Sequence, residues 1–383
     1  MSISVAKFDK WWKKRHDYAR EWKKRTNGKV MGYFCTYVPE EILIAADVLP
    51  VRILGTHEPQ DVTERHIFGG MFCPFCRDVL AQGLKGRYEY LNGIMIAQSC
   101  LHIRQSFGSW QMHVPTETSY YLPFPHGAQS PHAVPYLTEE FDKFKKYVEE
   151  WTGKTITDKD LDRGIEIMNK NRQLMLQIYE LRKEANPPLT GSEAMKMVAT
   201  SQMVDKEEHN KAMEEFLDEL QNRKLDRDPG VRLIILGSED DDTEFIEMVE
   251  NCQVPATIVV DEHCTGTRYF WGEVEKGDDR LKALATRYLG RPACPSKDWP
   301  ERRRTPHIMK LVKDWNVQGA ILVDQKFCVP HGIDNPTIKK ELEKNDIRTL
   351  YLEFDVVVPV GQFKTRVEAF LEILQMKLQE DLF

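Results

Sequence analysis

Two cysteines, Cys73 and Cys76, lie at the start of an expected helix, directly after a Gly-Gly turn. The positive end of a helix stabilises a thiolate, which is the form of cysteine that binds iron or zinc. Pro74 fits the first turn of such a helix, because its missing N–H needs no partner there. The stretch therefore predicts ionised sulfur at a helix N-terminus, although a lone Cys-x-x-Cys motif does not specify its chemistry.

Two further cysteines, Cys100 and Cys328, each follow an apolar strand and precede a helix. In open parallel sheets, ligands bind beyond the carboxyl ends of the strands, where both of these thiols fall. A site reached by these thiols and Cys73 must lie in a cleft between the two halves of the chain. Three widely spaced thiolates favour an iron-sulfur cluster in which one iron is not held by cysteine and can bind water, sulfur or substrate.

The other cysteines leave alternatives open. Cys76 and Cys264 are candidates for a fourth ligand, whereas Cys35, Cys252 and Cys294 are interpreted as structural. The Cys-x-x-Cys motif is also compatible with a redox dithiol, with half of a zinc site, or with ordinary buried thiols. Disulfides are disfavoured, because the compartment expected for this chain keeps thiols reduced.

Other residue types that could act in the cleft are fewer. His102 and His331 follow Cys100 and Cys328 closely and could serve as acids or as anchors for a thioester. Glu41 opens a helix after a strand end, although a carboxylate there also simply stabilises the helix. Arg268 could meet the phosphates of a cofactor or substrate. A solvated surface run is the simpler interpretation of the arginines at 302–304.

Length and composition set the broad class. A chain of 383 residues with 41% hydrophobic and 30% charged residues is typical of a globular protein with two or three domains. The net charge of −7 argues against nucleic acid as a partner. No apolar run is long enough for a membrane span and no signal-peptide core begins the sequence, so we expect a cytoplasmic protein without a membrane partner. No Gly-x-Gly-x-x-Gly or Walker motif predicts a nucleotide site.

Strand and helix patterns alternate in both halves of the sequence. Expected strands in the first half are at 30–36, 49–54, 93–98 and 118–122, and expected helices are at 9–25, 39–46, 73–84 and 101–110. The first helix is basic, with an aromatic stripe expected to pack on the body of the protein. Strand-helix alternation predicts a parallel sheet with helical crossovers.

A helical middle and a second alternating half follow. Helices are expected at 139–151, 158–184, 193–222, 243–251, 305–315, 337–343 and 362–378, and strands at 231–237, 256–260, 319–323 and 349–354. The predicted fold class is α/β, with two Rossmann-like (flavodoxin-like) parallel-sheet domains at 1–137 and 229–383. A helical segment at 138–228 joins them, and the cluster lies in the cleft between them.

Six ordered blocks of the sequence resemble one family, the iron-sulfur subunits of benzoyl-CoA reductases and 2-hydroxyacyl-CoA dehydratases. The blocks lie at 37–52, 73–77 (Cys-Pro-Phe-Cys-Arg), 98–100 (Gln-Ser-Cys), 264–271 (Cys-Thr-Gly-Thr-Arg-Tyr-Phe-Trp), 326–328 (Lys-Phe-Cys) and 361–370. The resemblance covers nearly the whole chain.

The resemblance implies a 4Fe-4S cluster held by Cys73, Cys100 and Cys328, with the acidic residue of the Pro-Glu-Glu block at Glu41. It also implies a related iron-sulfur subunit as partner and an ATP-hydrolysing iron-sulfur activator, with reduced ferredoxin as the indirect electron donor. The substrate it implies is benzoyl-CoA or a similar CoA thioester.

Two departures from the dehydratase pattern favour the reductase branch, and within it the smaller of the two catalytic chains. After the strand that precedes Cys100, dehydratases commonly have the sequence Ser/Thr-Cys-Asp, whereas this chain has Cys-Leu-His-Ile-Arg at 100–104. The second cysteine of the Cys-Pro-Phe-Cys-Arg block, Cys76, is also unusual for the dehydratases. We therefore expect an anaerobic, ATP-dependent reduction of the benzoyl-CoA ring, with His102 as proton donor and Arg268 and His331 binding substrate. A dehydratase subunit and a non-catalytic metal-binding or electron-relay subunit are the alternatives.

Overall fold

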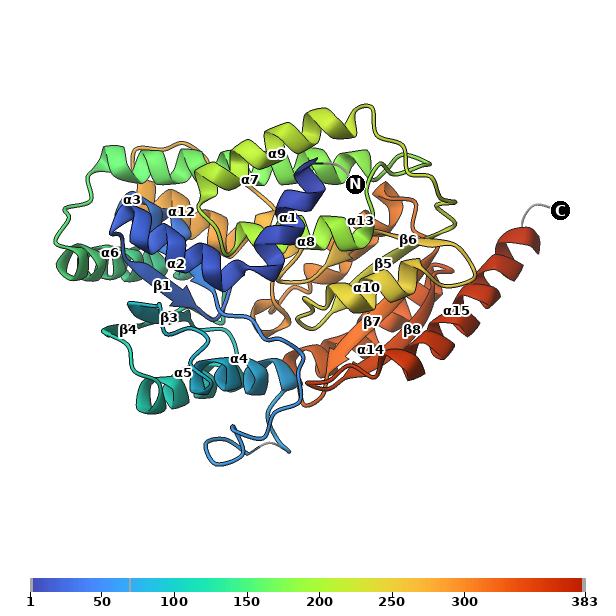
Figure 1. Ribbon diagram of the computed structural model, residues 1–383, viewed down its shortest axis with the longest axis horizontal. Coiled ribbons are helices and arrows are strands. Elements are labelled where there is room, and N and C mark those ends of the chain that lie inside the picture. Colours follow the sequence, from blue (N-terminus) through green and yellow to red (C-terminus); the bar gives the residue numbers. More distant parts are fainter. Residues whose placement is uncertain (1–2, 69, 381–383) are drawn as a thin grey trace.

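Eight short strands form two separate parallel sheets in the computed structural model, which describes residues 3–68 and 70–380 (Figure 1). The strands of the N-terminal sheet are β1 (Val30–Tyr33), β2 (Leu49–Arg52), β3 (Gly93–Ala97) and β4 (Thr118–Leu122). Those of the C-terminal sheet are β5 (Val231–Gly237), β6 (Ala256–Glu262), β7 (Gly319–Gln325) and β8 (Arg348–Phe354).

Both sheets have the same topology. Their strand orders are β2-β1-β3-β4 and β6-β5-β7-β8, and every neighbouring pair is parallel. Met31 pairs with Gly93 in the first sheet, and Leu233 pairs with Gly319 in the second. The strands other than β4 and β8 are buried throughout, as expected for apolar runs covered by helices on both faces. The predicted α/β fold class with two Rossmann-like parallel sheets is confirmed.

Helices surround both sheets. In the first half they are α1 (Ile3–Lys13), α2 (Arg15–Thr26), α3 (Glu40–Ala45), α4 (Pro74–Leu84) and α5 (Leu101–His113). The middle contains α6 (Ala133–Thr152), α7 (Asp158–Leu181), α8 (Gly191–Ser201) and α9 (Lys206–Leu220). The second half adds α10 (Thr243–Glu250), α11 (Thr267–Phe270), α12 (Arg280–Gly290), the 3-10 turn η1 (Pro295–Lys297), α13 (Arg304–Asp314), α14 (Val329–Lys344) and α15 (Val360–Glu380).

Local sequence sets several helix ends. Thr157 and Thr190 each begin a helix with a capping box, in which the threonine hydroxyl and a carboxylate three residues later satisfy each other's backbone N–H. Asp205 accepts hydrogen bonds from the first N–H groups of α9 and so divides the expected helix over 193–222 into α8 and α9. The helix expected over 9–25 is likewise two helices, α1 and α2, and its aromatic stripe packs inward through Phe8 and Trp22.

Two further differences from expectation lie in the C-terminal half. The helix after Cys328 begins at Val329 and runs through Pro336, whereas the sequence pattern predicts it from 337. Pro330 lies in its first turn, where a missing N–H costs nothing, so this proline does not delay the helix. The other difference is that α11, α12 and the 3-10 turn η1 are not predicted by the sequence pattern.

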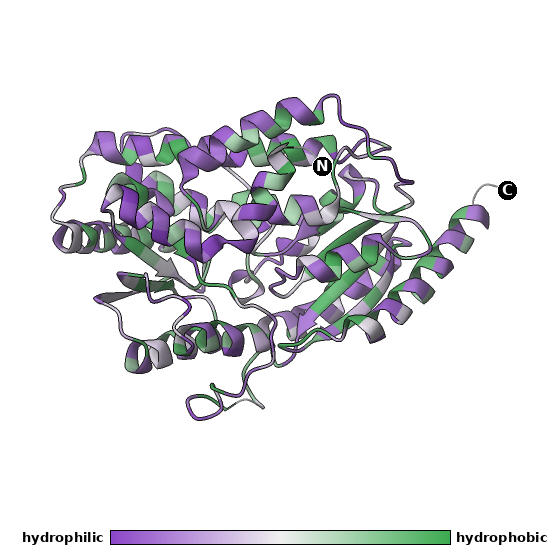
Figure 2. Cartoon of the chain, viewed as in Figure 1, coloured by the Kyte–Doolittle hydropathy of each residue, from purple (hydrophilic) through white to green (hydrophobic). Residues whose placement is uncertain are grey.

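The hydrophobic cores do not follow the order of the chain. One core joins the C-terminal sheet to α1, α7, α8 and α9, so much of the helical middle packs on that sheet. Another joins the N-terminal sheet to α6 and to α12, including Leu284 and Tyr288. Figure 2 shows apolar strands inside and mixed polar and apolar faces on the outer helices. Within the described residues, no helix is long and apolar enough to cross a membrane.

Candidate functional site

The carboxyl ends of the central strands meet at one cavity. In each sheet the strand order reverses between two neighbours, β1 and β3 in the first and β5 and β7 in the second. Such switch points open a crevice beyond the strand ends, where ligands bind in α/β folds. Cys35 and Cys100 follow β1 and β3, and Glu239 and Cys328 follow β5 and β7. All four line the same cavity, so both crevices open into one site.

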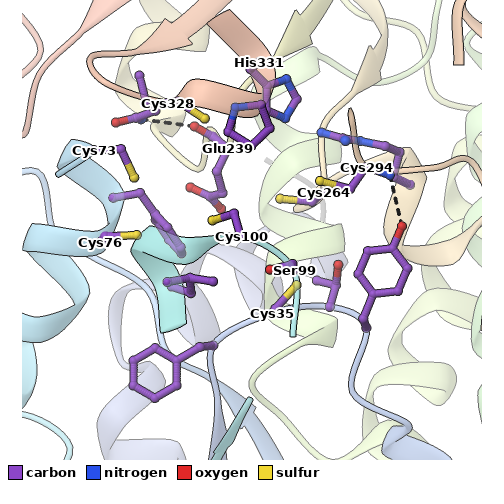
Figure 3. A pocket seen from close by; sticks show the side chains of 18 of the residues that line it. Cys35, Cys73, Cys76, Ser99, Cys100, Glu239, Cys264, Cys294, Cys328 and His331 are labelled. Carbon is purple, nitrogen blue, oxygen red and sulfur yellow. Dashed lines mark hydrogen bonds between the residues drawn. The ribbon is translucent and has the colours of Figure 1, made fainter. Parts of the chain in front are cut away.

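Thiols dominate this cavity, which has a volume of about 90 Å³ (Figure 3). Seven of the eight cysteines line it, and all are free thiols. They are Cys35, Cys73, Cys76, Cys100, Cys264, Cys294 and Cys328. The eighth, Cys252, lies outside it, beyond the end of α10. Phe34, Phe75 and Ile103 supply apolar surface between the thiols.

The three cysteines predicted as ligands share one local structure. Cys73, Cys100 and Cys328 are the N-cap residues of α4, α5 and α14. None of the three side chains makes a full capping hydrogen bond, so the thiols stay available to the cavity. Three helix N-termini therefore direct positive potential at one group of sulfur atoms, which favours anionic sulfur.

Burial acts against ionisation at two of these thiols. It raises the pKa of Cys100 and of Cys328, and nearby N–H groups at the helix N-termini offset this only in part. The pKa of Cys73 is lowered to about 6, because Cys76 hydrogen-bonds its sulfur and His102 lies close by. A bound metal would deprotonate thiol ligands outright, whatever the effect of burial on their pKa.

Glu239 forms the polar side of the cavity, and no sequence motif singled it out. Its Oε1 accepts hydrogen bonds from Arg52 Nη2 at 3.1 Å and from the Thr265 hydroxyl. Arg52 in turn donates to Gln202 Oε1 at 2.7 Å. Burial and the charge of Asp241 raise the pKa of Glu239 to about 7, against the influence of Arg52. Its position after β5 obeys the rule that identified Cys100, so the strand-end pattern could have found it.

The two residues predicted to bind substrate both reach this cavity. Arg268 and His331 line it, with exposed fractions of 2% and 6%. Arg268 donates to the Gly237 carbonyl at 3.1 Å and pairs with Glu262. The Nδ1 of His331 has no hydrogen-bond partner, and burial together with Arg304 lowers the pKa of this imidazole well below its usual value. These surroundings favour the neutral form of His331.

His102 lies behind Cys73 and is not among the lining residues. Its Nδ1 accepts a hydrogen bond from the Cys73 backbone N–H at 3.3 Å, and its ring packs against Phe72. Because Nδ1 is the acceptor, the neutral ring carries its proton on Nε2. In this structure the residue orients the loop that bears Cys73 and retains one N–H to donate.

Glu41 is also outside the cavity. It is fully buried, forms an ion pair with Arg172 and accepts a hydrogen bond from Tyr288 at 2.9 Å. Burial opposes its charge, but Arg172 and Arg287 outweigh burial and lower its pKa. Glu41 thus lies at the junction of α3, α7 and α12. Of the arginines at 302–304, only Arg304 is buried, where it pairs with Glu262 and Asp334.

The residues that line the cavity are compatible with a cluster bound by cysteines. Across residues 3–68 and 70–380, no three His, Cys, Asp or Glu side chains converge as a mononuclear metal requires. A 4Fe-4S cluster presents its irons at separate corners, so its cysteine ligands do not converge on one point. Thiols at three helix N-termini around a cavity with apolar walls fit this requirement. The residues that would hold such a group are Cys73, Cys100 and Cys328, with Cys76 and Cys264 beside them.

Comparisons with known proteins give the same family throughout. A family model described as "2-hydroxyglutaryl-CoA dehydratase, D-component" matches residues 35–374. The beta subunit of (R)-phenyllactyl-CoA dehydratase from Clostridium sporogenes is 24% identical over 358 residues, which cover 93% of this chain and 95% of that protein. One of the subunits of benzoyl-CoA reductase from Thauera aromatica is 24% identical over 354 residues, 90% of each chain.

A third relative, the beta subunit of (R)-2-hydroxyglutaryl-CoA dehydratase from Acidaminococcus fermentans, is 23% identical over 352 residues, covering 90% of this chain and 92% of that protein. Each of the three relatives is named as one subunit of an enzyme. The chain belongs to the 2-hydroxyglutaryl-CoA dehydratase D-component family, which includes dehydratase and benzoyl-CoA reductase subunits.

Proposed function

We propose that this chain is the iron-sulfur subunit of an enzyme that acts on an acyl-CoA thioester, with a 4Fe-4S cluster on Cys73, Cys100 and Cys328. The observation that carries the proposal is that these three thiols cap three helices, from both halves of the chain, around one cavity. When bound, the cluster supplies single electrons of low potential. The protein's part is to hold it between two sheets and to keep bulk water away with apolar walls.

In more detail, we propose reduction of benzoyl-CoA to a cyclic dienoyl-CoA by successive electron and proton transfers. The supporting observations are the sequence Cys-Leu-His-Ile-Arg at 100–104 and the match to the benzoyl-CoA reductase chain from Thauera aromatica. Arg268 and His331 are the proposed substrate-binding residues, and their positions in the lining of the cavity support this role. His102 is the proposed proton donor through Nε2. A related subunit and an ATP-hydrolysing activator fed by ferredoxin would complete the enzyme.

Dehydration of a 2-hydroxyacyl-CoA is the second candidate. The observation that favours it is the equal identity, 24%, to the (R)-phenyllactyl-CoA dehydratase beta subunit. Both reactions use the same cofactor and the same class of thioester, so the cavity alone does not separate them. The substrate assay must do so.

Iron analysis tests the common part of the proposal. The full chain, purified without oxygen, is expected to be brown and to contain iron and sulfide. Serine in place of Cys73, Cys100 or Cys328 should abolish most of this content, because serine cannot supply a thiolate. Cys252→Ser is the matched control, since that thiol lies outside the cavity, and its iron content should equal that of the wild type. A colourless protein that holds zinc would overturn the proposal.

Substrate assays test the finer part. The chain, assembled with its partner subunit and activator, is expected to consume benzoyl-CoA under a low-potential electron donor and to leave (R)-phenyllactyl-CoA unchanged. The opposite result would establish the dehydratase. His102→Gln should keep its iron but lose ring reduction by about 10²-fold or more if this side chain delivers the proton. An unchanged rate would remove His102 from that role.

A further inference from the structure

One carboxylate oxygen in the cavity has no partner. Glu239 has an exposed fraction of 8%, and its Oε2 makes no hydrogen bond, although Oε1 is held by Arg52 and Thr265. Figure 3 shows this side chain pointing into the space between Cys73, Cys100 and Cys328. An enclosed carboxylate oxygen without a donor is costly, so such atoms usually face a cation or a ligand.

The conformation of the backbone before Glu239 directs this side chain into the cavity. Gly237, the last residue of β5, has φ = 124°, a region that L side chains rarely adopt. A Cβ at this position would lie 2.1 Å from the Val323 carbonyl oxygen, so β5 and β7 could not approach as they do with another residue. The turn that follows places Ser238 against Asp324 and Glu239 toward the cavity. Strained turns of this kind are common at functional sites, where they fix the direction of a side chain.

One oxygen of Glu239 is hydrogen-bonded and the other is free, which is also the arrangement of a carboxylate that binds a metal through one oxygen. Ligating carboxylates are themselves hydrogen-bonded through the oxygen that does not bind the metal. Here Arg52 is anchored by Gln202 at 2.7 Å, and Gln202 also donates to the Thr265 carbonyl at 2.9 Å. Arg52 and Thr265 thus hold Oε1 from two separate segments, Gln202 ties those two residues together, and Oε2 has no hydrogen-bond partner.

On this basis we propose that Glu239 is the fourth ligand of the cluster, binding through Oε2 the iron that no cysteine holds. The inference rests on the proposed function, because it presupposes the cluster on Cys73, Cys100 and Cys328. The four irons of a cubane face four directions, and Cys76 shares the first turn of α4 with Cys73. Glu239 instead lies shortly after β5, whereas Cys100 lies shortly after β3 and Cys328 shortly after β7.

An oxygen ligand has a different consequence from a fourth thiolate. Carboxylate oxygen is a harder ligand than sulfur and binds iron-sulfur clusters less strongly, so a substrate or a water molecule can displace it. Glu239 would then keep the open iron occupied when substrate is absent and release it when substrate arrives. Arg52 and Thr265 would hold the displaced carboxylate in place.

Spectroscopy of the cluster tests this without any assay of activity. The full chain is reconstituted with isotopically enriched iron and sulfide without oxygen, as wild type, Glu239→Gln and Glu239→Asp. Mössbauer spectra of the wild type should contain a distinct iron site with an oxygen ligand. Both variants should lose that site. They should also bind cyanide about tenfold or more tightly than the wild type, as measured by electron paramagnetic resonance of the reduced cluster.

The two variants separate ligation from the ion pair with Arg52. Glu239→Asp keeps the charge but withdraws the oxygen from the cavity, so a purely structural ion pair predicts a wild-type spectrum for this variant. Glu250→Gln is the control, because Glu250 is another buried carboxylate of the same sheet region whose oxygens bind backbone N–H groups outside the cavity. Its spectrum should match that of the wild type.

The outcomes distinguish the two proposals. A wild-type chain that binds no iron-sulfur cluster refutes the proposed function and this inference with it. A wild-type cluster with three cysteine ligands, together with Glu239 variants of unchanged spectrum and cyanide affinity, refutes this inference alone.

Discussion

At the scale of single residues, Glu41 and Arg172 form an ion pair from which water is excluded, with exposed fractions of 0% and 3%. Removing one partner of such a pair leaves a buried charge uncompensated, which costs about 3–5 kcal/mol. We expect Glu41→Gln to lower the free energy of unfolding by about 3 kcal/mol or more in urea titrations. Glu180→Gln, at an exposed position, is the control and should change it by less than about 0.5 kcal/mol.

The pH dependence of this pair has a definite sign. The Glu41 pKa lies below its ordinary value of 4.5, because arginine charges outweigh burial. A lowered folded-state pKa contributes stability above 4.5 that is lost as the pH falls through the folded value. The wild type should therefore lose more stability on acidification than Glu41→Gln does. Unchanged stability of Glu41→Gln with loss of activity would assign Glu41 to catalysis instead.

The residues predicted from sequence were those whose type and position were both unusual. Cys73, Cys100 and Cys328 combine a rare side chain with a strand end or helix start, and the structure brings all three to one cavity. Glu239 also follows a strand end, but acidic residues are common there, so its position alone made it one candidate among many until the structure showed its enclosure and its unpaired oxygen. The partner of Glu41 is 131 residues away, so no local pattern shows that this carboxylate is paired.

At the scale of elements, the connection between β2 and α4 is fastened to the C-terminal half by His57. This residue has φ = 59°, donates its backbone N–H to Asp78 at 2.8 Å, and places Nε2 2.7 Å from Asp241 Oδ1. Arg77 at the other end of the connection pairs with Asp355. The segment that contains Cys73 is thus tied to the C-terminal half of the chain both before and after this cysteine.

Alkaline pH should release this connection. Burial opposes the charged form of His57, but the charge and hydrogen bond of Asp241 outweigh it and raise the pKa to about 10. A raised folded-state pKa gives stability that is complete below 6.5 and lost as the pH rises toward 10. Melting temperatures measured across this range should fall more for the wild type than for His57→Gln. The exposed His132→Gln serves as control, and equal falls in wild type and His57→Gln would contradict the expectation.

Helices and strands were predicted correctly where the apolar pattern was strong. The prediction failed where tertiary packing determines the local structure. The strands of both sheets were expected close to their observed positions, because buried parallel strands are continuous apolar runs. The helix α12 was missed, since it follows a loop with charged residues and becomes a helix by packing on α6. Pro330 and Pro336 led to a predicted start of α14 that is too late, because prolines usually end or break a helix.

At the scale of the whole molecule, the two halves are not independent. Leu284 and Tyr288 of α12 are buried in the core of the N-terminal sheet, and Tyr288 donates to the Val38 carbonyl. A fragment of residues 1–228 lacks these side chains, each of which contributes about 1.5–3 kcal/mol of apolar burial. We expect that fragment to aggregate or to bind a hydrophobic dye, whereas the full chain unfolds in one transition. A monomeric, cooperatively folded fragment would contradict this.

Because seven thiols line one cavity, exposure to air is expected to oxidise them together. In the structure, Cys73 and Cys76 are close enough to share a hydrogen bond, and oxidation joins such neighbours as a disulfide or converts them to sulfinic acids. A disulfide is reversed by a reductant, whereas a sulfinic acid is not. We therefore expect the oxidation state of these sulfurs, more than the supply of iron, to limit the fraction of air-exposed molecules in which the proposed cluster can be reconstituted.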